Sequence, residues 1–105
     1  MTSDSKRLLY KMFSEYKSRR KKGINRQNAL CFGSYEQIAP LLPDDLPEDV
    51  DEYLRELSRL GYIKAFYADD HVYDCCLTTE AVEKMENLPL DTFRSVLDFI
   101  SKFIP

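Results

Sequence analysis

Apolar residues near the start of the chain repeat at helical spacing. Ser3 and Asp4 are both suited to cap a helix, and the apolar run stops before the basic segment 17–22. The pattern predicts an amphipathic first helix over residues 1–22 with a basic end. Its apolar face consists of Leu8, Leu9, Met12, Phe13 and Tyr16.

The next two apolar groups are short and are separated by polar residues. Residues 28–32 are too few for a stable helix, so they predict a short strand. Ser34 and Gln37 have the spacing of a capping box. They predict a second helix over residues 34–42, which stops at Pro43.

A third helix is predicted over residues 45–60. Asp45 and Glu48 have the spacing of a second capping box, and Gly61 suits the left-handed position that ends a helix. The apolar positions repeat as expected for a helix with one buried face. That face comprises Val50, Tyr53, Leu54, Leu57 and Leu60.

Alternating apolar and polar residues follow the third helix. They predict a β-hairpin over residues 62–77, with its turn at Asp69 and Asp70. Strict alternation in the return strand places Val72 and Cys75 on opposite faces.

Two further helices are predicted after the hairpin. Thr78 is suited to cap a helix over residues 78–87, and Pro89 separates it from a last helix over residues 90–104. The apolar surface of the last helix is wider than one buried stripe, so it either packs against the first helix or forms an interface. We expect a homodimer formed through Phe93, Val96, Leu97, Ile100, Phe103 and Ile104.

The predicted elements fit a single domain of 105 residues, residues 1–105. Their order, α-β-α-α-β-β-α-α, is that of an α+β, mostly helical, winged helix–turn–helix with a small antiparallel sheet. The apolar segments are too short to span a membrane, and we expect no signal peptide. Three cysteines without a disulfide framework favour a reducing compartment, so we expect a cytoplasmic protein.

Charge is distributed unevenly along the chain. Residues 1–27 hold nine Lys and Arg against two acidic residues, a net charge of +7, whereas residues 28–105 have a net charge of −10. Such asymmetry is typical of a polyanion-binding end on an acidic body. Attraction between the two halves of the chain, or between two copies, explains it equally well.

The basic segment at the end of the first helix is the main nucleic-acid signal. Cations at a helix C-terminus are also favoured by the helix dipole, so a solvated helix end explains the same residues. The alternative is a patch that contacts DNA phosphates without sequence specificity. Its members are Lys17, Arg19, Arg20, Lys21, Lys22 and Arg26.

The surface that reads DNA in a helix–turn–helix is acidic in this chain. The third helix and the hairpin turn would meet the phosphates with like charge, so groove readout by this helix is unfavourable. Asp51 and Arg55 are also spaced to pair along the helix. The first strand should pair with the return strand of the hairpin, which places the basic segment far from the hairpin turn. The acidic residues are Glu48, Asp49, Asp51, Glu52, Asp69 and Asp70.

Reactive side chains are few. His71 is the only histidine, and the three thiols are Cys31, Cys75 and Cys76. Cys75 and Cys76 point to opposite faces of a strand, so one metal ion does not easily bind both. A Cys–His nucleophile would need His71 beside a thiol, but Cys75 lies about 13 Å along the strand. We therefore expect no enzymatic activity and no metal or cofactor.

Three features resemble the MarR/PadR-type winged-helix regulators of bacteria and phages: the LGYI junction at 60–63, the hairpin, and the LT pair at 77–78. The whole layout is similar to that of the small YjcQ-like proteins. The resemblance implies a dimeric transcription regulator that binds DNA.

Two hypotheses follow. The protein contacts DNA phosphates through residues 17–26, or it is a protein-interaction module that uses the acidic third helix or the apolar last helix.

Overall fold

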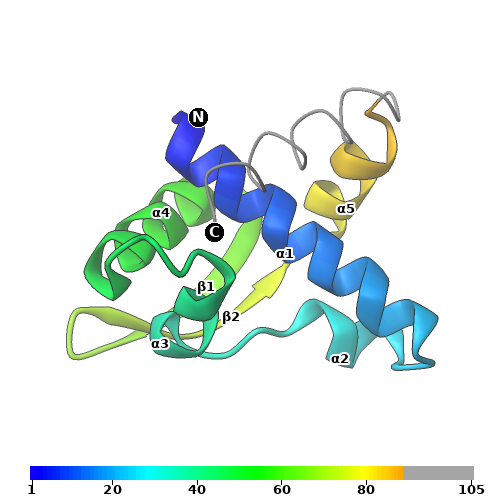
Figure 1. Cartoon of the computed structure of the whole chain (residues 1–105), viewed down its shortest axis with the longest axis horizontal. Coiled ribbons are helices and arrows are strands. Elements are labelled where there is room, and N and C mark those ends of the chain that lie inside the picture. Colours follow the sequence, from blue (N-terminus) through cyan, green and yellow to red (C-terminus); the bar gives the residue numbers. More distant parts are fainter. Residues whose placement is uncertain (89–105) are drawn as a thin grey trace.

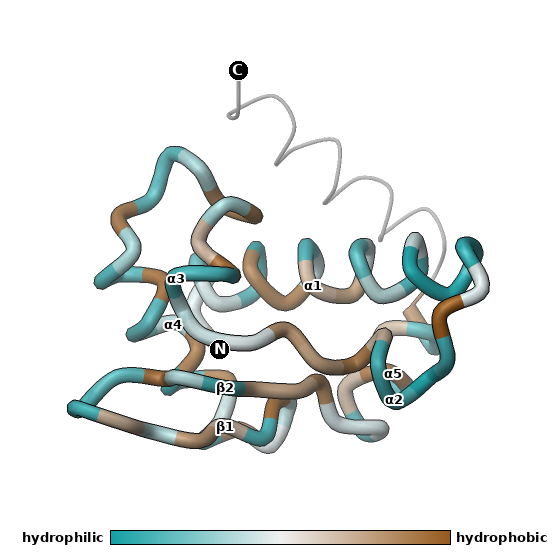
Figure 2. Tube along the Cα trace, turned by 90° about the horizontal axis from the view of Figure 1, so that it is seen from below, coloured by the Kyte–Doolittle hydropathy of each residue, from teal (hydrophilic) through white to brown (hydrophobic). Residues whose placement is uncertain are grey.

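The first helix, α1 (Ser3–Lys21), lies along one side of the molecule, and the β-hairpin lies on the opposite side (Figure 2). The structure is a computed structural model that describes residues 1–88. Thr2 caps α1 by accepting the Ser5 N–H, in place of the predicted Ser3 or Asp4. The predicted apolar face is confirmed, because all its members are buried: Leu8, Leu9, Met12, Phe13 and Tyr16.

A helical turn, α2 (Arg26–Leu30), occupies most of the segment 28–32, where a strand was predicted. Asn25 caps this turn through a side-chain hydrogen bond, a local stabilisation that competes with extended structure. Only Cys31 pairs with the return strand of the hairpin, as an isolated antiparallel bridge to Cys76. The strand prediction is therefore wrong in extent, although the pairing partner is the expected one.

The predicted second helix consists of α3 (Tyr35–Ile38) followed by a 3-10 turn, η1 (Ala39–Leu41). Its capping box is confirmed. The Gln37 N–H donates to Ser34 Oγ, and the Ser34 N–H donates to Gln37 Oε1 at 2.8 Å. These two bonds satisfy backbone donors that the helix itself leaves unpaired.

Helix α4 (Pro47–Arg59) starts later than predicted and has no side-chain cap. Asp45 does not form the predicted capping box, because its carboxylate instead accepts hydrogen bonds from Arg7 at 2.9 and 3.3 Å and from Tyr53 at 2.8 Å. This contact joins the start of α4 to α1. Leu60, predicted to be buried, is 47% exposed because it follows the last helical residue.

Strands β1 (Ile63–Ala68) and β2 (His71–Leu77) form a two-stranded antiparallel sheet. Asp69 and Asp70 form its turn, as predicted, and both have positive φ, +53° and +64°. This is the turn geometry that suits the twist of paired strands, and Asp tolerates it better than most residues do.

Strand β2 contains a bulge. Tyr67 pairs with Val72, whereas the preceding residue of β1 pairs with Asp74, so Tyr73 is an extra residue without a partner in β1. The bulge brings both Val72 and Cys75 onto the buried face, where each has 0% exposure. The prediction that they face opposite sides is therefore wrong.

Helix α5 (Thr79–Glu86) follows the hairpin and is capped by Thr78, as predicted. The last predicted helix, 90–104, lies outside the described residues. Residues 1–88 are mostly helical with one small antiparallel sheet, in agreement with the predicted α+β class. None of the helices in this part of the chain is long and apolar enough to cross a membrane. The face of α1 packs on a core that includes Val50, Leu54, Leu57, Ile63, Val72, Cys75, Leu77, Ala81, Val82 and Met85.

Candidate nucleic-acid interface

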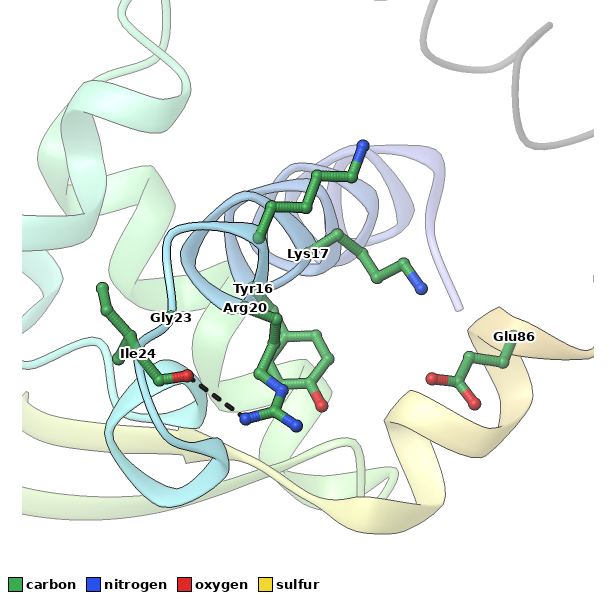
Figure 3. A pocket seen from close by; sticks show the side chains of 7 residues that line it. Tyr16, Lys17, Arg20, Gly23, Ile24 and Glu86 are labelled. Carbon is green, nitrogen blue, oxygen red and sulfur yellow. Dashed lines mark hydrogen bonds between the residues drawn. The ribbon is translucent and has the colours of Figure 1, made fainter.

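The last turns of α1 border an open pocket of about 440 Å³ (Figure 3). The Arg20 guanidinium lies beside the Tyr16 ring, and Glu86 of α5 faces the pocket from the other side. Three cations and one carboxylate therefore surround the same hollow. Its lining residues are Tyr16, Lys17, Arg20, Lys21, Gly23, Ile24 and Glu86.

A Schellman motif closes α1 and forms the rim of this pocket. The Gly23 N–H donates to the Arg20 carbonyl, and the Ile24 N–H donates to the Arg19 carbonyl, both at 3.1 Å. Gly23 has φ +88°, the left-handed conformation that the motif requires. The Arg20 side chain then donates to the Ile24 carbonyl at 3.2 Å, which holds the loop against the helix.

Arg19 differs from the other five predicted cations because its guanidinium has several partners within the protein. Its guanidinium pairs with Glu15 at 3.2 Å and donates to the carbonyls of Ala29 at 3.3 Å and Cys31 at 2.7 Å. It also lies 4.5 Å from the centroid of the Phe32 ring. Arg19 therefore joins α1 to the end of α2 and to the residue after it, and three of its five N–H donors are engaged in these contacts.

The other five predicted cations remain at the surface. All are exposed, and none has an ion-pair partner within residues 1–88. Three line the pocket, and the other two continue the surface along the loop and the start of α2. We call these five residues the basic end: Lys17, Arg20, Lys21, Lys22 and Arg26.

Asp51 is absent from the acidic surface where the sequence placed it. Only 4% of the residue is exposed, and its carboxylate accepts hydrogen bonds from the Val72 N–H at 2.8 Å and Arg55 Nε at 3.1 Å. His71 Nδ1 lies 3.3 Å away. Burial alone would raise the pKa of Asp51, but these hydrogen bonds outweigh it and hold the pKa below its ordinary value. The predicted Asp51–Arg55 pair is confirmed.

The exposed acids of α4 and of the hairpin turn lie away from the basic end, whereas Glu86 of α5 lines the same pocket as its cations. Glu48 and Glu52 are exposed on α4, and Asp69 and Asp70 form the exposed hairpin turn. Figure 1 shows this turn at one end of the molecule and the end of α1 with α2 at the other. Cys31 pairs with β2 next to the basic end. The basic end therefore lies far from the hairpin turn, as the strand pairing predicted.

Comparisons with protein-family models, with curated proteins and with solved structures find no match to this chain.

Two of the three thiols lie together. The Sγ atoms of Cys31 and Cys76 are 2.7 Å apart, whereas Cys75 points into the core. Within residues 1–88, no group of three or more His, Cys, Asp or Glu side chains is arranged to hold a metal ion. The proposed dimer residues, Phe93, Val96, Leu97, Ile100, Phe103 and Ile104, lie outside the described residues.

Proposed function

We propose that this protein is a non-enzymatic winged-helix protein that binds nucleic acid through phosphate contacts from its basic end. The order of elements supports the fold assignment. Helix α1, the bridge at Cys31, the pair α3 and α4, the hairpin and α5 follow one another as the elements of a winged helix do. The bridge joins the first extended residue to the return strand, which is the pairing expected of that fold.

The observation that carries the functional proposal is the clustering of exposed cations around one open pocket. Lys17, Arg20 and Lys21 line the hollow, while Lys22 and Arg26 extend it. A cluster of like charges raises the free energy of the isolated protein, and a polyanion relieves that repulsion. Each Lys or Arg that meets a phosphate also releases a condensed counterion, which drives binding in dilute salt.

The mode of binding follows from the position of the acids. Glu48 and Glu52 on α4, together with the acidic hairpin turn, would be repelled by the phosphates of a groove. Helix α4 therefore serves as scaffold, and the basic end contacts the backbone from the other end of the molecule. Backbone contacts position a protein on nucleic acid but carry no base information, so we expect binding with little sequence preference.

Fluorescence anisotropy with a labelled random-sequence duplex tests this proposal. If all five cations contact phosphates, log affinity should fall with log salt concentration with a slope of about −4 to −5. A single-stranded probe of the same sequence should show a shallower slope. Absence of binding in dilute salt would refute the proposal.

The exposed side chains of the hairpin support a second candidate, a protein-interaction module. Phe66, Tyr67 and Tyr73 are 44, 48 and 55% exposed, and the adjacent turn carries Asp69 and Asp70. Aromatic side chains beside acids suit a basic peptide segment, because they offer both apolar contact and charge. Titration with an oligolysine peptide, followed by NMR, should then shift the hairpin resonances and leave those of the basic end unchanged.

A further inference from the structure

We infer that Cys31 and Cys76 form an oxidisable dithiol, a site that hydroperoxides convert to an intramolecular disulfide. The two residues are 45 positions apart in the sequence. They are directly opposite in the antiparallel bridge between the segment after α2 and strand β2. Their Sγ atoms lie 2.7 Å apart as free thiols.

The backbone around the pair already has the geometry of a cross-strand disulfide. The Phe32 N–H donates to the Cys75 carbonyl at 2.9 Å, so the hydrogen bond flanks the pair and does not join Cys31 to Cys76. In such non-hydrogen-bonded pairs the Cα atoms are about 4.5 Å apart. This separation lies within the range that disulfides span, so the bond forms without backbone rearrangement.

The surroundings assign different roles to the thiols. Cys31 is exposed, and Cys76 is half-buried. Burial, together with the hydrogen bond to Cys31, raises the pKa of Cys76, so this thiol is the poorer first nucleophile. Cys75 is fully buried, and burial raises its pKa to about 12, which keeps it unreactive. We therefore place the initial attack on Cys31.

The chemistry balances with a hydroperoxide, ROOH, as oxidant. The Cys31 thiol loses its proton and the thiolate attacks the terminal oxygen. The O–O bond breaks, and the released RO⁻ takes up a proton and leaves as ROH, so Cys31 becomes a sulfenic acid. Cys76 then loses its proton and attacks Cys31 Sγ, the S–OH bond breaks, and water leaves. Two thiols are oxidised by two electrons in total, and the hydroperoxide is reduced to ROH and water. A dithiol reductant reverses the reaction by exchange.

The bond would fix the segment that adjoins the basic end. Arg19 already donates to the Cys31 carbonyl at 2.7 Å, so a disulfide at this residue connects β2 through Cys31 to the last turn of α1. The loop between Lys22 and Cys31 would then be held at both ends. A covalent link across so long a loop also restricts the unfolded chain, which raises stability.

The test is to treat the full-length chain with hydrogen peroxide and to measure its mass and free thiols. We expect a product with no covalent link between chains, in which each chain lacks two hydrogens and retains one free thiol, which alkylation and peptide sequencing assign to Cys75. The oxidised protein should unfold at a temperature on the order of 10 °C higher, and dithiothreitol should remove the increase.

Matched variants show whether Cys31 and Cys76, and not Cys75, form the disulfide. Cys31→Ser and Cys76→Ser should each abolish both the mass change and the thermal shift, whereas Cys75→Ala should retain them. The wild-type mass and peptide assignment decide the question even if Cys75→Ala does not fold. The inference is overturned if the peroxide leaves the thiols unchanged, if it converts Cys31 to a sulfinic acid, or if it links two chains.

Discussion

The Asp51 carboxylate accepts the backbone N–H of Val72 at 2.8 Å and thereby joins helix α4 to the bulged strand β2. Both residues are buried. The same carboxylate is held by Arg55 within α4 and by His71 at the start of β2. A buried backbone donor without an acceptor is costly, so this side chain, together with the shared apolar core, holds the hairpin on the helix.

Replacement of Asp51 should therefore destabilise the fold. In Asp51→Asn, one oxygen still accepts the Val72 N–H, but the amide NH₂ faces the Arg55 Nε donor. We expect a loss of roughly 2–3 kcal/mol in the free energy of unfolding, measured by urea denaturation. Glu52→Gln, an exposed acid on the same helix, is the matched control and should change stability by less than about 0.5 kcal/mol. Equal effects of the two substitutions would contradict this role.

Acid should weaken the protein through the same carboxylates. Hydrogen bonds to Asp51 and Asp45 outweigh their burial, so both have pKa values below the ordinary 3.8. A lowered pKa means that the folded state binds protons less readily than the unfolded state. The stabilisation by these carboxylates is therefore fully present at pH values above their ordinary pKa, and it is lost as the pH falls through their pKa in the folded state. The urea midpoint of the wild type should decline below about pH 4. The decline should be smaller in Asp51→Asn. Parallel pH profiles of the wild type and the variant would show that Asp51 is not responsible.

Local periodicity explains which parts of the fold were predictable. The buried face of α1, the hairpin with its turn at Asp69, and the Thr78 cap all follow from patterns within a few neighbouring residues. The burial of Asp51 does not follow from a local pattern, because its hydrogen-bond partner Val72 is 21 positions away. Asp45 likewise has the spacing of a cap, yet it accepts hydrogen bonds from Arg7, a residue of another helix.

For the candidate site, the sequence predicts which residues are present but not how their side chains are arranged. The sequence groups six cations, and nothing in their chemistry distinguishes Arg19 from Arg20. The difference arises because Arg19 faces the carbonyls of Ala29 and Cys31, whereas Arg20 faces the pocket. The bulge in β2 and the approach of Cys31 to Cys76 are also consequences of tertiary pairing.

The phenol of Tyr53 should contribute measurably to stability. It donates to Asp45 at 2.8 Å, beside the Arg7–Asp45 ion pair that joins α1 to the start of α4. Tyr53→Phe removes this hydrogen bond and leaves the ring in place, so we expect a loss of about 1 kcal/mol in urea denaturation. Tyr73→Phe, which alters an exposed ring, should be neutral within about 0.5 kcal/mol. A neutral Tyr53→Phe would argue against the proposed contribution of the contact.

Two glycines with the same backbone conformation should differ in their tolerance of a methyl group. Gly33 and Gly61 have φ of +86° and +82°. A Cβ at Gly33 would lie 2.0 Å from Gln37 Oε1, the capping-box acceptor, whereas a Cβ at Gly61 meets open space. Gly61→Ala should cost about 1 kcal/mol for the left-handed conformation. Gly33→Ala should cost about 1 kcal/mol more, because the cap is displaced. Equal losses in thermal or urea unfolding would show that the cap adapts without cost.

If the basic end, and not the net charge of the chain, binds nucleic acid as proposed, two triple variants of equal net charge should differ. A triple variant, Lys17→Gln, Arg20→Gln and Lys21→Gln, removes the three cations that line the pocket. A matched control, Lys6→Gln, Arg59→Gln and Lys64→Gln, removes three exposed cations elsewhere and changes the net charge equally.

The deciding measurement is the salt dependence of duplex binding for these two variants and the wild type. We predict that the slope of log affinity against log salt becomes shallower by about 3 in the pocket variant and stays within about 0.5 of the wild-type value in the control. Equal losses in both variants would refute a specific role of the basic end, because they would show that any three cations serve as well as those at the end of α1.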